Sequence, residues 1–314
     1  MIEVKNLTKR YGNHLAVYHL NFTVESGKIY GFLGPNGAGK STTMNIMTGY
    51  LGATEGQVLI DGHDILKEPE EAKKNIGYLP EIPPLYMEMT VREYLEFAAE
   101  LKGIKKDKRE PQIEEVIRLA KLRDVENRLI QNLSKGYKQR VGLAQAVLGF
   151  PEIIILDEPT VGLDPKQIIE IRELIRKLAK KHTVILSSHI LAEVREVCDY
   201  IMIISGGKLV ASDMTENLEN MMSGKGQIEV EAKAPRDEMD HIIRRTGKIK
   251  EVKYRTSASG ITTAQIIAKG GEDIREELFL AFSHADVPML TLNQSKTTLE
   301  EIFLELTQGS GNRR

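Results

Sequence analysis

The segment Gly34-Pro-Asn-Gly-Ala-Gly-Lys40-Ser41 limits what the chain can fold into more than any other. An apolar run at 28–33 precedes it and predicts a short strand, and residues 41–47 predict a helix directly after it. The glycines let the backbone close round phosphate oxygens, because a Cβ would obstruct that approach. Lys40 adds a positive charge for the β- and γ-phosphates, and the Ser41 hydroxyl can ligate Mg²⁺. The segment therefore predicts the nucleotide-binding strand, loop and helix of an α/β fold.

A second apolar strand, 153–156, ends in two adjacent carboxylates, Asp157 and Glu158. Such a pair is costly unless a cation or a water molecule uses it. Asp157 can hold Mg²⁺, directly or through water, while Glu158 polarises the water that attacks the γ-phosphate. The alternative is an ordinary acidic strand end. His189 follows the apolar run 183–188 at the same sheet edge and could reach the γ-phosphate, although a single histidine there is more often structural.

Apolar spacing predicts three kinds of structure in the first two thirds of the chain. Alternation within 2–24 and a strand at 56–62 indicate an antiparallel sheet near the nucleotide. Steps of three and four residues within 90–103 and 112–122 indicate helices of an insert that covers about 85–145. The remaining runs indicate parallel βαβ units, with strands at 153–156, 183–186 and 200–204 and a helix at 165–181.

A Ser-Gly-Lys-Gly stretch near 221–226 predicts a linker, so we expect a nucleotide-binding domain at 1–220 and an accessory domain at 227–314. The first six elements after the linker follow a β-α-β-β-α-β order, which is typical of a small ferredoxin-like α+β sandwich. The expected elements are strands 227–233, 249–256, 261–268 and 288–294, and helices 236–246, 272–284 and 297–307.

Composition excludes several classes of protein. The 43 basic and 45 acidic residues give a net charge of −2 without a long basic run, which argues against direct nucleic-acid binding. No apolar stretch is long enough to span a bilayer and the first residues do not resemble a signal peptide, so a cytoplasmic chain is expected. The single cysteine, Cys198, excludes an intrachain disulfide and is expected to pack a helix. The seven histidines lack paired metal spacing.

In sequence order, these motifs resemble the nucleotide-binding subunits of ATP-binding-cassette (ABC) transporters over about residues 1–220. Leu133–Tyr137 resembles the signature, Ile153–Glu158 the Walker B strand, Asp164 within 162–165 the D-loop, and His189 the switch histidine. The resemblance implies a P-loop NTPase fold with a RecA-like parallel sheet. It also implies an aromatic stacked on adenine and a Walker A loop, here Tyr11 with Gly34, Pro35, Asn36, Gly37, Ala38, Gly39, Lys40, Ser41 and Thr42.

The resemblance further implies ATP hydrolysis with Mg²⁺ between two nucleotide-binding domains that pair head to tail, identical or paralogous. Glu158 would be the general base, and Lys40 and His189 would stabilise γ-phosphate charge. The implied partner is an ABC-type membrane permease, which would hold the chain at the inner face of the membrane. The Mg²⁺ ligands would be Ser41, Glu81 and Asp157, and the signature acting in trans before a helix at 137–149 would be Ser134, Lys135, Gly136 and Tyr137.

Two departures narrow the resemblance. The family signature usually reads Leu-Ser-Gly-Gly-Gln, whereas this chain has Lys135 and Tyr137 in it, and Glu81 stands where relatives often have a glutamine. Lys135 could add charge near phosphate or extend into solvent. These variants and the tail 298–307 resemble the branch that serves exporters of drugs, lipids or gliding-motility components. The loop 83–89 could receive a permease helix or pack on its own helix.

Two other classes of function fit the sequence less well than a transporter subunit does. A non-transport ABC ATPase, such as a resistance, translation or chromosome-associated factor, usually has two cassettes in one chain or long coiled coils between Walker A and signature. This chain has one set of motifs, and Ser41 and Ser134 are close in sequence. A small-molecule kinase would not explain 133–137, and the Asn-Lys-x-Asp of a GTPase does not occur in the sequence.

Overall fold

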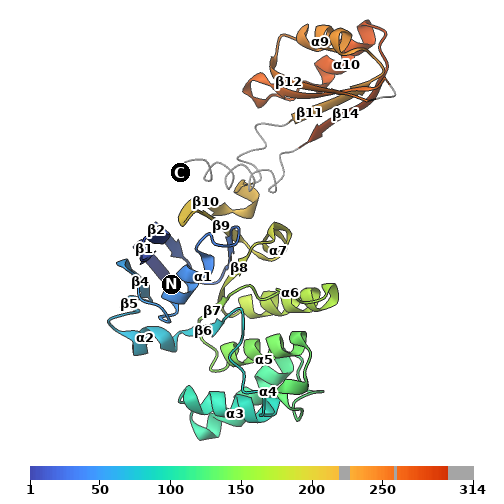
Figure 1. Cartoon of the computed structure of the whole chain (residues 1–314). Helices are drawn as coiled ribbons and strands as arrows, with labels where there is room; N and C mark the ends of the chain where they lie inside the picture. Colours follow the sequence, from blue (N-terminus) through green and yellow to red (C-terminus); the bar gives the residue numbers. More distant parts are fainter. Residues whose placement is uncertain (219–226, 258–259, 296–314) are drawn as a thin grey trace. The chain divides into compact units, whose positions relative to one another are not determined.

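The computed structural model describes residues 1–218, 227–257 and 260–295, which form two compact units that divide between Thr215 and Glu216 (Figure 1). Each unit is described by itself. The predicted linker 221–226, the predicted helix 297–307 and the tail 298–307 lie outside the described residues.

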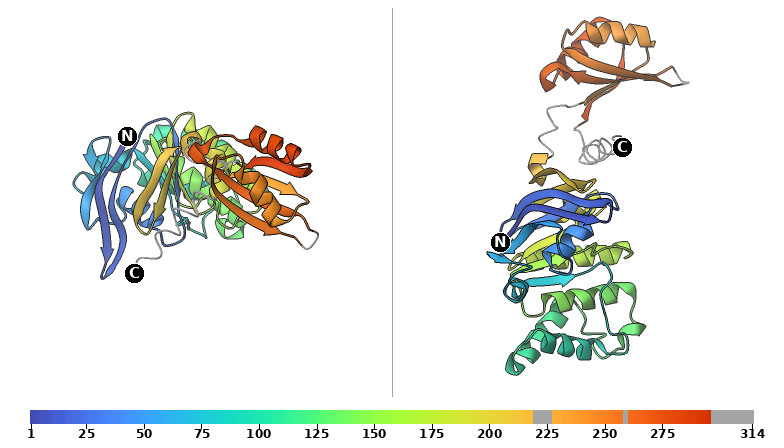
Figure 2. Two further views of the ribbon diagram at one scale, coloured as in Figure 1. Left: turned by 90° about the horizontal axis from the view of Figure 1, so that it is seen from above. Right: turned by 60° about the vertical axis from the view of Figure 1, so that its left-hand side comes forward.

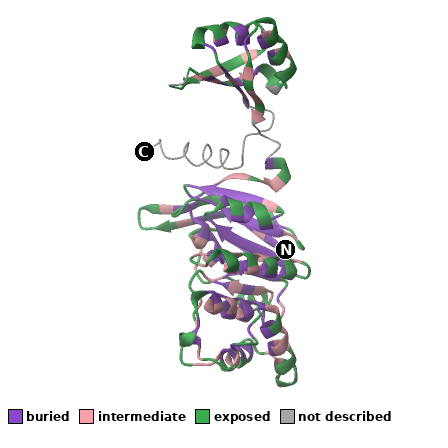
Figure 3. Cartoon of the chain, turned by 90° about the vertical axis from the view of Figure 1, so that its right-hand side faces the viewer, coloured by how far each residue is buried: buried purple, intermediate pink, exposed green. Residues whose placement is uncertain are grey.

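A six-stranded sheet forms the centre of the first unit, in the order β10-β9-β3-β8-β7-β6. The pairs from β9 to β6 are parallel, and β10 is antiparallel to β9. Every residue of β3 and β7 is buried, as expected for parallel strands covered on both faces (Figure 3). The strands are β3 (Ile29–Leu33), β6 (Ile76–Leu79), β7 (Ile153–Leu156), β8 (Thr183–Ser188), β9 (Tyr200–Ser205) and β10 (Lys208–Met214).

A four-stranded antiparallel sheet, β2-β1-β4-β5, lies beside the nucleotide loop, as the alternating pattern predicted. Its apolar side chains share one core cluster with those of β3 and α1. Its strands are β1 (Ile2–Tyr11), β2 (His14–Val24), β4 (Glu55–Ile60) and β5 (His63–Asp64).

Helices connect the strands and form the insert. The insert helix α4 begins at Lys106, well before the predicted 112, because Pro111 is accommodated inside the helix at the loss of one backbone hydrogen bond. The helix after the signature covers 135–147 and not 137–149, since Ser134 caps it. The helices of this unit are α1 (Lys40–Met47), α2 (Pro69–Lys74), α3 (Val91–Leu101), α4 (Lys106–Leu119), α5 (Lys135–Val147), α6 (Pro165–Ala179) and α7 (Leu191–Val197).

The second unit has the predicted β-α-β-β-α-β order and an antiparallel sheet in the order β12-β13-β11-β14 (Figure 2). β13 lies between β11 and β12, so the first βαβ unit is split, as in ferredoxin-like folds. Its helices and one sheet face enclose a separate apolar core that includes Ile243 and Phe282. The elements are β11 (Gln227–Ala232), α9 (Arg236–Arg244), β12 (Ile249–Thr256), β13 (Thr262–Ala268), α10 (Arg275–His284) and β14 (Met289–Ser295).

The structure also tests the expectations about Cys198 and about membrane-spanning segments. Cys198 is buried at the end of α7, where its Sγ lies against Gly31 of β3, and burial raises the pKa of its thiol. It therefore packs the helix on the sheet, as predicted. Within the described ranges, no helix is both long and apolar enough to cross a lipid bilayer.

Candidate active site

The phosphate loop connects the buried end of β3 to α1 and needs its glycines for two different reasons. A Cβ on Gly34 would lie 2.3 Å from the backbone oxygen of Ile204, so no larger residue fits there. Gly39 caps α1 with a φ of 105°, which L side chains rarely adopt. Because these glycines have no side chains, the loop amides and the N-terminus of α1 come together at one place, which favours the binding of an anion.

Lys40 is buried, and its ammonium bridges the loop to the carboxylate strand. It donates a hydrogen bond to the backbone oxygen of Gly34 at 2.8 Å. The same Nζ lies 3.3 Å from Glu158 Oε1, and both side chains are under a tenth exposed. This pair places Lys40, the predicted cation for the phosphates, beside the predicted general base.

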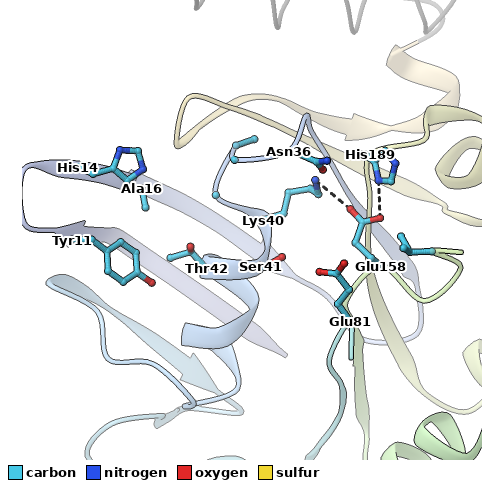
Figure 4. Close-up of a pocket in the computed structure, with 14 residues that line it drawn as sticks. Tyr11, His14, Ala16, Asn36, Lys40, Ser41, Thr42, Glu81, Glu158 and His189 are labelled. Atoms are coloured by element: carbon cyan, nitrogen blue, oxygen red, sulfur yellow. Dashed lines mark hydrogen bonds and ion pairs between the residues drawn. The ribbon is translucent and has the colours of Figure 1, made fainter. Parts of the chain in front are cut away.

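Glu158 is held between two basic groups, as Figure 4 shows. Its Oε2 lies 2.9 Å from His189 Nδ1, while Oε1 faces Lys40. Its backbone has a φ of 46°, an uncommon value for a residue with a side chain, which turns it away from the line of β7. His189, predicted to lie at the same sheet edge, is therefore in direct contact with the predicted general base.

Asp157 points into the fold next to two hydroxyl groups. Ser41 Oγ lies 3.2 Å from its Oδ1, and Ser187 Oγ donates to the same oxygen at 2.5 Å. Burial raises the pKa of Asp157, and hydrogen bonds from Ser187 and Ser41 oppose that rise. Ser187 also accepts the backbone N–H of Glu158 at 2.8 Å, so one hydroxyl orients both carboxylate residues.

A cavity of about 470 Å³ joins the loop to the carboxylate strand end (Figure 4). Tyr11, at the tip of the β1–β2 hairpin, lines it at the opposite end from Glu158 and His189. His14, which pairs with Tyr11 across the hairpin, lines it as well. Eleven of the predicted residues surround this space, namely Tyr11, Asn36, Gly37, Ala38, Gly39, Lys40, Ser41, Thr42, Glu81, Glu158 and His189. A cavity with a tyrosine ring at one end, which can stack on a base, and a phosphate loop at the other suits an extended nucleotide.

The side chains suit Mg²⁺ bound together with a nucleotide. Ser41, Glu81 and Asp157 line one adjoining cavity, so three oxygen-bearing side chains border the same space. Mg²⁺ usually takes one or two protein carboxylates and completes its shell with water and substrate phosphates. Among the described residues, no three His, Cys, Asp or Glu side chains form a metal cluster by themselves. The donor set therefore fits a metal that arrives with phosphate.

The predicted signature lies apart from the cavity lining. Ser134 caps α5 by accepting the N–H of Tyr137 at 3.4 Å. The Tyr137 hydroxyl donates to Asp124 at 2.5 Å, and the Arg140 guanidinium lies 5.3 Å from the centre of the Tyr137 ring. The Tyr137 side chain thus holds α5 to the segment after α4, while Ser134 remains exposed at a helix N-terminus.

Lys135 contacts the predicted D-loop of the same chain, and Gly136 lies against Gln167 in the first turn of α6. The Lys135 ammonium lies against Gly162, where a Cβ would meet Nζ at 2.1 Å. A Cβ on Gly136 would lie 2.5–2.7 Å from the amide group of Gln167. Gln167 and Asp164 form the capping box that starts α6, with Asp164 Oδ1 accepting the Gln167 N–H at 2.9 Å. Lys135 therefore lies along the D-loop.

Sequence reasoning missed Ser187 and His14. Ser187 is fully buried at the end of an apolar strand, and a buried hydroxyl requires a hydrogen-bond partner, which was the available signal. His14 gave no such signal, because its place in the cavity depends on the register of the hairpin.

Comparison with known proteins identifies the family. A model of the ABC transporter family matches residues 17–161. The bacitracin transport ATP-binding protein BcrA of Bacillus licheniformis is 44% identical over 212 residues, which are 67% of this chain and 68% of BcrA. The chain belongs to the ABC transporter ATP-binding proteins. This confirms the predicted family and the function as an ATP-binding subunit of an ABC transporter.

Two further comparisons extend the match. The linearmycin resistance ATP-binding protein LnrL of Bacillus subtilis (strain 168) is 30% identical over 308 residues, 98% of each chain. Among solved structures, the dimeric ATP-binding cassette MJ0796 in a post-hydrolysis state with ADP and phosphate is 28% identical. The superposition has a TM-score of 0.62 and covers 68% of this chain and 99% of the MJ0796 chain. The ABC ATPase fold of the first unit agrees with the predicted fold class.

Proposed function

We propose that this ABC subunit hydrolyses ATP with Mg²⁺ to drive an export permease. The observation that carries the proposal is the contact of Glu158 with both Lys40 and His189 at one end of a nucleotide-sized cavity. Relatives named for bacitracin transport and linearmycin resistance support the export of antimicrobial compounds. Partner-bound, the chain would lie at the cytoplasmic face of the membrane.

In the proposed reaction, the γ-phosphate takes over the Lys40 ammonium and leaves Glu158 Oε1 to accept a proton from the attacking water. His189 holds Oε2 and stabilises charge on the phosphate. Mg²⁺, when bound, neutralises charge on the β- and γ-phosphates. Ser41, Asp157 and Glu81 would hold it.

Hydrolysis further requires a second nucleotide-binding domain, supplied by another copy or by a paralogue. Ser134 is exposed at the N-terminus of the 13-residue α5, where a hydroxyl and the helix dipole suit a phosphate bound by the partner. The dimeric cassette MJ0796 supports this arrangement.

Glu158→Gln tests the assignment of the base. The amide cannot accept a proton from water, so turnover should fall by at least about a hundredfold, while ATP binding persists and a closed dimer accumulates. Measurements are phosphate release, fluorescent-nucleotide affinity and light scattering. Near-normal hydrolysis by the variant would refute the role of Glu158.

The permease is proposed to bind at an apolar groove between the loop 83–89 and α3. This groove of about 490 Å³ is lined by Tyr86, Phe97 and Leu101, among others. Tyr86 packs edge-on against Phe97 with 5.2 Å between ring centres, yet is 51% exposed. The two alternatives for this loop, packing on its own helix and receiving a permease helix, are thus compatible, since the Tyr86 ring can pack on α3 and still present its outer face to a partner.

Replacing Tyr86 and Met87 by alanine should reduce co-purification with the permease and abolish transport, without changing ATP affinity. The matched control is Tyr18→Ala on β2, a tyrosine that is 39% exposed and does not line this groove. Unchanged co-purification and transport in the double variant would end the docking proposal.

A further inference from the structure

A buried carboxylate outside the ATP cavity links the two segments that carry Glu158 and His189. Glu193 lies in α7 and is 6% exposed. Its Oε2 accepts a hydrogen bond from Thr160 Oγ1 at 2.6 Å and another from Ser188 Oγ at 3.0 Å. One carboxylate oxygen therefore ties the segment after β7 to the end of β8.

The two hydroxyl groups are close to the reacting side chains in sequence. Thr160 is two residues after Glu158, and Ser188 directly precedes His189. Local hydrogen bonds make both segments compact, because Leu163 N–H donates to the Thr160 carbonyl at 3.2 Å and Ile190 N–H donates to the Ser188 side-chain Oγ at 3.0 Å. A shift of either hydroxyl would therefore alter the separation of Glu158 and His189.

The position requires a carboxylate for a second reason. Glu193 Oε1 lies 3.9 Å from Arg172 Nη2, and Arg172 also pairs with the more exposed Glu196. A glutamine could keep one oxygen toward the two hydroxyls, but its NH₂ would then face the guanidinium, donor against donor. A buried charge is costly unless it is paired, so its presence here indicates a demand for both sets of contacts.

We propose that Glu193 is a positioning residue for ATP hydrolysis, which sets the geometry of the Glu158–His189 pair through Thr160 and Ser188. This inference rests on the proposed ATPase function. Because Glu193 does not line the nucleotide cavity, it acts on turnover and leaves the affinity for ATP unchanged.

Hydrogen–deuterium exchange of the full chain without nucleotide tests the tether alone. In Glu193→Gln, the amides of Ile190 and Leu163 should exchange about tenfold faster, as expected for the loss of one hydrogen-bonded constraint. The control Glu196→Gln, which removes the other partner of Arg172, should leave them unchanged. Exchange at the wild-type rate in Glu193→Gln overturns the inference, whether or not the chain hydrolyses ATP.

Steady-state kinetics tests the consequence for hydrolysis. Misplacing a reacting group by about 1 Å can cost about a hundredfold in rate, so kcat should fall ten- to a hundredfold. KM for ATP should stay within about twofold, since the nucleotide contacts are intact. Thr160→Val should lower kcat by a similar factor. The double variant that combines Glu193→Gln with Thr160→Val should have a kcat no lower than that of either single variant.

Several results would overturn the positioning role. These are a kcat equal to that of Glu196→Gln, additive losses in the double variant, or a raised KM with kcat unchanged. If Glu193→Gln does not fold, Thr160→Val carries the same test, because it keeps the buried carboxylate and removes one donor. Wild-type protein without ATPase activity would instead refute the proposed function, and the exchange experiment would still decide the tether.

Discussion

At the scale of single residues, Asp157 is both buried, which disfavours its charge, and a proposed ligand of Mg²⁺, which requires that charge. It is 3% exposed, and burial raises its pKa despite the hydroxyl groups of Ser41 and Ser187. A raised pKa means that the folded protein binds the carboxyl proton more tightly than the unfolded chain does. The ionised carboxylate therefore destabilises the fold above the usual pKa range of aspartate, and this penalty disappears at lower pH.

Asp157→Asn should consequently raise the thermal stability of the protein at pH 7 by on the order of 1 kcal/mol, a typical single-site effect. The amide oxygen can still accept from Ser41 and Ser187, and the charge is gone. The gain should shrink as the pH is lowered towards about 4. Calorimetry with a chelator and without nucleotide measures it, and Mg-ATP turnover should fall in the same variant. A lower melting temperature at pH 7 would contradict the assigned penalty.

At the scale of elements, α6 depends on a capping box formed by a residue of the predicted D-loop. Asp164 accepts the Gln167 N–H, and the Gln167 side chain returns a bond to the Asp164 N–H. The amide of Gln167 also lies against Gly136. One side chain thus meets both the start of α6 and the signature, so stability and activity can be separated only by a variant that keeps the cap.

Asp164→Ser is such a variant. Serine is as good a cap as aspartate, so the free energy of unfolding should change by less than about 0.5 kcal/mol, whereas Asp164→Ala should cost about 1 kcal/mol. If the Asp164 carboxylate contacts a second nucleotide-binding domain, turnover should fall in both variants. Thr90→Ala, which removes the capping box of α3, serves as control and should lose stability alone. Full turnover in Asp164→Ser would exclude a role beyond the cap.

At the scale of the whole molecule, two units have separate apolar cores. BcrA aligns with 67% of the chain, whereas LnrL aligns with nearly all of it. Every described residue that lines the nucleotide cavity belongs to the first unit. Ligand binding should therefore stabilise that unit and leave the other unchanged.

Calorimetry of the full chain should show two unfolding transitions, of which Mg-ATP shifts only one. At a nucleotide concentration one hundred times Kd, the shifted transition should gain about 2.7 kcal/mol. Glu158→Gln prevents hydrolysis during the scan. A single cooperative transition, or a nucleotide shift in both, would mean that the units unfold together.

Local patterns predicted the elements because the information lies within a few residues. Apolar spacing and turn residues located four of the five parallel strands to within two residues, but β6 (Ile76–Leu79) was not predicted, and a contiguous motif located the phosphate loop. The predicted start of α4 was wrong because the apolar spacing begins only after Pro111, whereas the helix begins at Lys106 and includes this proline. The sequence predicted that Lys40, Glu158 and His189 lie at one edge of the sheet, but their direct contact could not be predicted, since it depends on how the ends of β3, β7 and β8 are placed side by side.

The sequence by itself determined the phosphate loop, the acidic strand end, the order of the elements in the second unit and the family, because each is recorded in contiguous residues or their spacing. Tertiary structure decided which side chains meet. Ser187 bonds Asp157, Lys135 lies along Gly162, and Glu193 joins two loops, all across segments distant in sequence. The physical reason is that side-chain contacts depend on strand order and helix packing, which no local pattern encodes.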